Sequence, residues 1–202
     1  MLRVSGISVD LEEKFEQALL CGIARKLGLD IAEITSYQLV KKAVDARKKS
    51  RVHFVCTADV TLKTKENAVL NRSVGSDVRL APETVYCLPE WKRAKNARPV
   101  VCGTGPAGLF AALVLARAGL HPIVSERGRK VESRPCDVER FWSGGPLSEE
   151  SNVLFGEGGA GTFSDGKLTT GIHDIRCRYV LEEFVRCGAP EEILYLAKPH
   201  IG

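Results

Sequence analysis

Hydrophobic and polar residues alternate in three segments near the N-terminus, a pattern typical of strands that bury one face. The first segment begins with Leu2, Val4 and Ile7, and the other two cover residues 34–44 and 52–62. One face of the last segment carries Val52, Phe54, Cys56, Ala58 and Val60. We therefore expect three strands here, with a basic turn at residues 47–51 joining the second strand to the third.

A helix is expected between the first two strands, because apolar residues recur there at every fourth position. These residues are Leu11, Phe15, Leu19, Ile23 and Leu27. Asp10 is the expected N-cap, with Glu13 as its capping-box partner. Gly28 is the expected C-terminal stop.

Two weaker signals complete the first domain, which we place at residues 1–89. Residues 65–71 favour a short helix and residues 84–88 a short strand, whereas residues 73–82 show little pattern. The resulting order, β-α-β-β-α-β, predicts a ferredoxin-like α+β sandwich.

A charged segment at residues 90–98 precedes Pro99 and indicates a linker. The pattern then changes to strand, glycine turn, helix and strand. This order predicts that residues 99–202 form the opening of a doubly wound, Rossmann-like α/β domain.

The glycine turn follows a short apolar strand at residues 100–102 and has the spacing GxGxxG. Gly103 would let the chain turn out of the strand, Gly105 would let a pyrophosphate approach the backbone, and Gly108 would let the helix pack closely. Pro106 and Ala107 follow Gly105 and are expected cofactor contacts as well. The first amides of the following helix would face the phosphates. The turn therefore predicts a dinucleotide site.

The helix after the turn is expected to pack one apolar face on the sheet and to end at Gly119. That face comprises Ala107, Leu109, Phe110, Leu113, Val114 and Ala116. A second strand at residues 122–125 then leads to Glu126 and Arg127. A carboxylate at this position accepts the hydroxyls of an adenosine ribose and repels a 2′-phosphate. A tight turn in an α/β protein without a ligand is the alternative.

A second glycine-rich segment, residues 156–166, offers further groups to a cofactor. Gly158, Gly159 and Gly161 free the backbone, Thr162 supplies a hydroxyl, and Lys167 adds a cation just beyond. The alternative is a glycine-rich hairpin or loop that turns at residues 165–166.

Long stretches of the chain resemble a known family. They are KKAVDARKKSRVHFVCTADV (41–60), ERG (126–128), ESNVLFGEGGAGTFSDGKLTTGI (150–172) and YVLEEFVRCGAPEEILYLAKPHIG (179–202). The sequence is similar to bacterial FAD-dependent dehydrogenases of the NAD(P)/FAD-dependent oxidoreductase class, in which a small ferredoxin-like domain precedes the flavoprotein. Ser125 and Cys102 depart from the aliphatic residues usual there.

The resemblance implies FAD as the cofactor of the half-site at residues 100–127. It implies hydride transfer through FAD, with NAD(P)H as a candidate donor and with an unknown acceptor and small-molecule substrate. On this interpretation the chain is the N-terminal portion of a flavoprotein and its partner is the remainder of that protein. The chain alone is expected to be inactive and to bind FAD weakly if at all. No catalytic residue is assigned, although His200 becomes a candidate near the flavin.

Composition favours a cytoplasmic protein. Hydrophobic residues make up 44% of the chain, and the longest apolar run, residues 109–116, is too short to span a membrane. The N-terminus lacks the features of a secretion signal. The 7 cysteines form no CxxC pair, which indicates reduced thiols, and the 4 histidines are too scattered for a metal site.

Two other classes of function stay open. One is a noncatalytic nucleotide-binding module. The other is a nucleic-acid-binding protein that uses Lys41, Lys42, Arg47, Lys48, Lys49 and Arg51. This second class is disfavoured because aromatic residues do not interleave with the charges. His173, Asp174 and Arg176 are best explained as a solvated loop.

Overall fold

The computed structural model describes residues 1–72, 77–82, 85–88, 90 and 98–201. The chain divides into two compact units. Unit 1 combines Met1–Tyr86 with Lys167–Ile201, and unit 2 is Cys87–Gly166. The protein is a mixed α/β chain with one antiparallel sheet and one small parallel sheet, each in a different unit.

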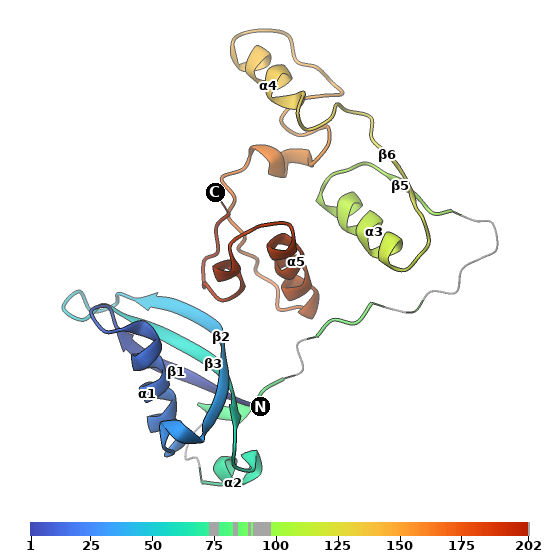
Figure 1. Cartoon of the computed structure of the whole chain (residues 1–202). Coiled ribbons are helices and arrows are strands. Elements are labelled where there is room, and N and C mark those ends of the chain that lie inside the picture. Colours follow the sequence, from blue (N-terminus) through green and yellow to red (C-terminus); the bar gives the residue numbers. More distant parts are fainter. Residues whose placement is uncertain (73–76, 83–84, 89, 91–97, 202) are drawn as a thin grey trace. The chain divides into compact units, whose positions relative to one another are not determined.

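The sheet of unit 1 has the order β2-β3-β1-β4, and all its neighbouring strands are antiparallel (Figure 1). Its strands are β1 (Leu2–Asp10), β2 (Ile34–Asp45), β3 (His53–Leu62) and β4 (Val78–Leu80). The helices α1 (Phe15–Leu27) and α2 (Glu66–Leu70) fall between β1 and β2 and between β3 and β4. The three strands expected from the alternation and the long helix expected from the fourfold spacing are thus present.

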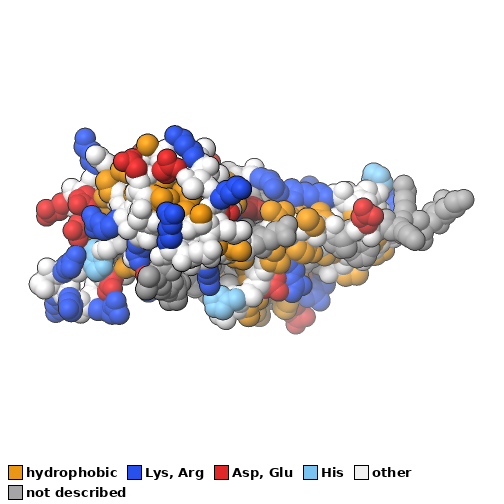
Figure 2. Space-filling view, turned by 90° about the horizontal axis from the view of Figure 1, so that it is seen from below, with side chains coloured by type: hydrophobic (Ala, Val, Ile, Leu, Met, Phe, Trp, Pro, Cys, Tyr) orange, Lys and Arg blue, Asp and Glu red, His pale blue; other side chains and the backbone are white. Residues whose placement is uncertain are grey.

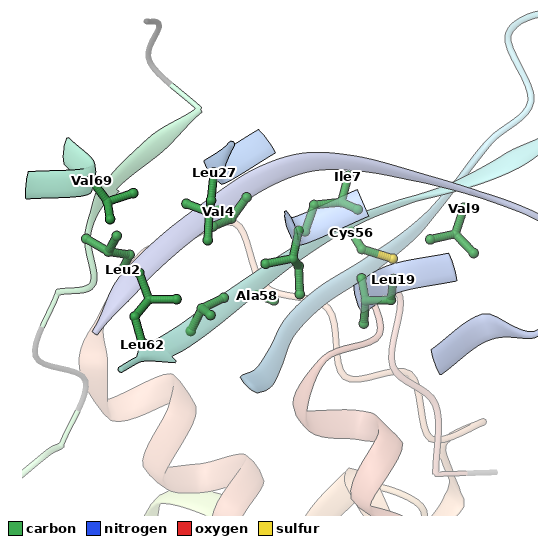
Figure 3. Packing of buried hydrophobic residues seen from close by; sticks show 12 residues of the cluster. Leu2, Val4, Ile7, Val9, Leu19, Leu27, Cys56, Ala58, Leu62 and Val69 are labelled. Carbon is green, nitrogen blue, oxygen red and sulfur yellow. The ribbon is translucent and has the colours of Figure 1, made fainter. Parts of the chain in front are cut away.

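The core of unit 1 lies between the sheet and α1 (Figure 3). The sheet contributes Leu2, Val4, Ile7, Val9, Cys56, Ala58, Val60 and Leu62, and the helix contributes Leu19, Ile23 and Leu27. Gly22 allows the close approach, because a Cβ there would lie 2.5 Å from Cγ2 of Ile7. Burial of these apolar side chains is the main force that holds the helix on the sheet.

The start of α1 differs from the prediction. Lys14 is the N-cap and makes no side-chain cap bond, whereas Asp10 is the last residue of β1 and pairs with His53. The expected cap at Asp10 was wrong because strand pairing extends through that position. The predicted stop is confirmed, since Gly28 takes a left-handed conformation with φ of 64°.

The fourth strand also lies elsewhere. It is β4, whereas residues 85–88 carry no strand and Thr84 lies outside the described residues. β4 pairs three residues with the start of β1 and leaves Leu80 57% exposed. A three-residue edge strand is too short to show an alternating pattern, which explains the wrong position.

Beyond the edge strand β2, unit 1 gains a segment from the end of the chain. The backbone N–H of Lys42 donates to Tyr195 at 2.7 Å, and the N–H of Ala197 donates back to Lys42 at 2.9 Å. The segment follows α5 (Ile175–Arg186) and η3 (Glu191–Leu194). The contacts thus group residues 167–201 with unit 1, whereas the sequence boundary at residues 99–202 stays a prediction. Residues 91–97 of the predicted linker lie outside the described residues.

Unit 2 begins with the strand–helix–strand order expected from the sequence. β5 (Val100–Cys102) pairs in parallel with β6 (Ile123–Ser125), and α3 (Pro106–Arg117) connects them. α4 (Arg134–Trp142) and the short helix η2 (Gly159–Phe163) follow. No residue of α3 is buried, so the expected apolar inner face is only partly covered, because the adjacent sheet has two strands of three residues.

Within the part of the chain that the structure describes, every helix is too short or too polar to cross a membrane.

Candidate functional site

The glycine turn between β5 and α3 gives each of its three glycines a different setting. Gly103 has a φ of 94° and donates its N–H to the carbonyl of Ser125 at 2.6 Å. A Cβ on Gly108 would lie 2.0 Å from the carbonyl oxygen of Gly103, whereas a Cβ on Gly105 would meet nothing within 4 Å. The turn is therefore tightly packed at Gly108 and open at Gly105.

The helix α3 starts at this open position. Gly105 is its N-cap and makes no side-chain cap bond, and Pro106 occupies the first turn. The first helical bond in this region runs from the N–H of Leu109 to the carbonyl of Gly105 at 3.0 Å. The amides before Leu109 belong to the first turn, where the helix dipole favours an anion.

The carboxylate of Glu126 is held against the glycine turn. Its Oε2 accepts the backbone N–H of Thr104 at 2.6 Å and the hydroxyl of Thr104 at 2.8 Å, and its Oε1 accepts the N–H of Gly128 at 2.8 Å. The bond from Gly128, followed by those from Thr104, lowers the pKa of Glu126. The ionised carboxylate has acceptor positions beyond these three bonds.

A pocket of about 410 Å³ brings the turn and the glycine-rich segment together. Its lining residues are Cys102, Gly103, Gly105, Ser125, Glu126, Arg127, Leu154, Phe155, Gly156 and Gly159. This volume falls in the range of about 300–1,000 Å³ that is typical of small-molecule sites. Six of these residues come from the glycine turn and the end of β6, and four from the later segment.

The glycine-rich segment packs directly on the turn. Gly158 donates its N–H to the carbonyl of Thr104 at 2.9 Å, and a Cβ on Gly159 would lie 3.3 Å from Cα of Gly105. The described residues 151–166 contain η2 and no strand, so the hairpin form of the alternative was wrong, whereas its loop form agrees with the structure. The segment instead wraps around one buried side chain, which comes from α4.

That side chain is Arg134, which the sequence reasoning missed. Its guanidinium is fully buried at the start of α4 and also lies over the ring of Phe163, 4.9 Å from the ring centre. It donates hydrogen bonds to the carbonyls of Asn152, Val153, Glu157 and Gly159 and to the hydroxyl of Thr162. An arginine beside a proline at a helix start gives no sequence signal for such a role, because surface arginines are far more common.

The pocket lining lacks seven predicted site residues: Pro106, Ala107, Gly108, Gly158, Gly161, Thr162 and Lys167. The first three belong to the start of α3, and the next three to the glycine-rich segment packed on the turn. Thr162 directs its hydroxyl to the carbonyl of Glu157 at 3.3 Å and to Arg134 at 3.1 Å. Lys167 belongs to unit 1, where its backbone forms an isolated antiparallel β-bridge with that of His200. Cofactor contact by these residues stays a prediction.

Asp174 and Arg176, expected in a solvated loop, lie at the start of helix α5, so the loop interpretation was wrong for Arg176. Asp174 caps α5 by accepting the N–H of Arg176 at 2.8 Å, and the two side chains form an ion pair. The side-chain bond from Arg176, followed by its backbone bond, lowers the pKa of Asp174, and the bond to Asp174 raises the pKa of Arg176. The pair thus serves the end of the helix.

The basic residues around the β2–β3 turn do not form a uniform surface. Arg47 pairs with Asp45 at 2.6 Å, and Lys42 places its Nζ over the rings of Phe15 and Phe54 at 4.0 and 4.3 Å. On the face drawn in Figure 2, Lys and Arg side chains are interspersed with acidic and apolar ones. Among the described residues no cluster of His, Cys, Asp and Glu is suited to hold a metal ion.

Comparison with known proteins finds similarity to one domain family and to one longer protein. A domain family of unknown function, DUF8436, matches residues 1–61. An uncharacterized protein of Clostridium beijerinckii is 44% identical over 202 residues, which is 100% of this chain and 38% of that relative. The chain therefore spans less than half the length of the relative it matches.

Proposed function

We propose that unit 2 binds the adenosine diphosphate portion of FAD and that the protein is an FAD-dependent oxidoreductase. The observation that carries this proposal is the 2.6 Å bond between the carboxylate of Glu126 and the backbone of Thr104. It holds an ionised acid beside an open glycine turn, and both line one pocket.

Each group has a role in this proposal. The pyrophosphate lies against Gly105 at the start of α3, where a Cβ would otherwise occupy the space. The remaining acceptor positions of Glu126 take the ribose hydroxyls, and its negative charge disfavours a 2′-phosphate. The residues present therefore fit the ADP portion of a dinucleotide.

The choice of FAD over NAD rests on the resemblance at residues 126–128, 150–172 and 179–202. When bound, FAD supplies the capacity to accept and release a hydride. The residues of unit 2 bind and orient its adenosine end. We propose NAD(P)H as a donor, with the substrate, the acceptor and the catalytic residues unassigned, and a cytoplasmic location.

The finer fold assignments belong to the same proposal. The order β2-β3-β1-β4 with antiparallel neighbours supports a ferredoxin-like domain in unit 1. The parallel pair β5 and β6 joined by α3 supports a Rossmann-like opening in unit 2. Further sequence of the full-length protein would supply the rest of the flavin site, and the 202-residue chain alone would be inactive.

The test is the visible absorption spectrum of the purified full-length protein, with the released cofactor identified by chromatography and mass spectrometry. We expect a flavin spectrum, FAD as the released compound, and bleaching of the flavin by NADH or NADPH. Colourless protein that releases no flavin after reconstitution with FAD would refute the proposal.

A further inference from the structure

An exposed aromatic side chain stands in the wall of the pocket that contains Glu126. Phe155 is 49% exposed, and its neighbour Leu154 is 63% exposed. Both side chains line the pocket together with Gly103 and Gly105. Apolar side chains that gather in the wall of a concave site indicate a surface for a ligand.

The loop that carries Phe155 is held by Asn152, whose side chain is buried. Oδ1 of Asn152 accepts the N–H of Leu154 at 2.9 Å and the N–H of Phe155 at 3.1 Å. The backbone N–H of Asn152 donates to the carbonyl of Phe155 at 3.1 Å, and Nδ2 donates to Ser148 at 2.7 Å. These bonds hold the ring of Phe155 at the pocket before any ligand arrives.

Arg127 links this ring to the carboxylate. It follows Glu126 in the sequence, and its guanidinium carbon lies 5.3 Å from the centre of the Phe155 ring. Contacts thus run from Thr104 through Glu126 and Arg127 to Phe155. A flat base on a ribose at Glu126 would meet the ring, and bases stack on aromatic rings and on guanidinium groups.

We propose that Phe155, supported by Arg127, is the residue on which the purine base of the bound nucleotide stacks. This inference rests on the proposed function, because it requires a ribose at Glu126. It adds a recognition residue outside the glycine turn and assigns a base-binding role to the segment at residues 152–155.

The experiment titrates the isotope-labelled chain with ADP and, separately, with inorganic pyrophosphate, and follows binding by NMR. The variants are F155A and F155W, with F141A as the matched control. Phe141 is also a partly exposed phenylalanine of unit 2, 40% exposed on α4, and does not line the pocket.

We expect F155A to weaken ADP binding about 5- to 150-fold, the range covered by base–aromatic stacking, and to leave pyrophosphate binding unchanged. F155W should retain ADP binding, F141A should behave as wild type, and adenine protons should show nuclear Overhauser effects to the Phe155 ring. Equal loss of both ligands, or loss of neither, in F155A would overturn the stacking role alone. If wild type bound neither ADP nor pyrophosphate, the proposed nucleotide site would be refuted, and the stacking role of Phe155 would be refuted with it.

Discussion

The guanidinium of Arg134 donates a hydrogen bond to the carbonyl oxygen of Gly159 at 2.8 Å, across 25 positions of sequence. Gly159 in turn packs against Gly105 of the glycine turn. Arg134 therefore acts on the pocket through the backbone: it draws several carbonyls inward and fixes the segment that closes one side of the site.

Replacement of Arg134 by methionine should destabilise unit 2 and loosen this segment. The variant leaves buried carbonyls without a donor, and each unsatisfied group costs about 1–3 kcal/mol. We expect a fall in the free energy of unfolding of at least ~2 kcal/mol, with faster hydrogen exchange at residues 152–162. Arg140→Met, an exposed position on the same helix, is the control. Equal exchange rates in the two variants would contradict the role of Arg134.

The carboxyl of Glu126 should titrate below its ordinary value of about 4.3, because hydrogen bonds from Gly128 and Thr104 favour its charged form. A lowered pKa in the folded state makes a contribution to stability that is complete above the ordinary value. That contribution is lost as the pH falls through the folded pKa. A carbon-detected NMR titration of Glu126 measures the pKa directly. In Thr104→Val, which removes one donor, the pKa should rise part of the way back, and no rise would contradict the assigned cause.

Alanine at Gly105 should affect ligand binding, whereas alanine at Gly108 should affect stability. Gly105 has a φ of −69° and open space around its Cβ position, so Gly105→Ala should change the free energy of unfolding by no more than ~0.5 kcal/mol. It should nevertheless weaken ADP binding by about tenfold or more, equivalent to about 1.4 kcal/mol.

Gly108→Ala should instead destabilise the chain by more than ~2 kcal/mol, since its Cβ would clash with a backbone carbonyl. Chemical denaturation and ADP titration separate the two effects. Full ADP affinity in Gly105→Ala would argue against a phosphate at that position.

In unit 1, the paired side chains of Arg3 and Asp59 bridge β1 and β3 through two bonds of 2.7 Å. Both side chains are nearly buried, with exposed fractions of 11% and 7%. Asp59→Leu leaves a buried charge without its partner and should cost about 3–5 kcal/mol in urea denaturation. The double variant Arg3→Met with Asp59→Leu should recover most of that loss. If it is no more stable than the single variant, the ion pair is not the cause.

The sequence by itself determined the elements whose signals are local. Alternation predicted β1 to β3, fourfold spacing predicted α1, and the order of strand, glycines, helix and acid predicted the turn at Gly103 and the position of Glu126. Each of these signals lies within a short stretch, where backbone propensity and the burial of one face act on neighbouring residues.

Tertiary structure decided what depends on contacts between distant residues. The position of β4 follows from pairing with β1, and the bonds of Arg134 reach residues 18 to 28 positions away. The role of Asn152 in presenting Phe155 also needs the folded loop, because an asparagine in a polar stretch is typical of any turn. A hydrogen bond between distant residues depends on how the whole chain packs, and no local pattern of side chains records that packing.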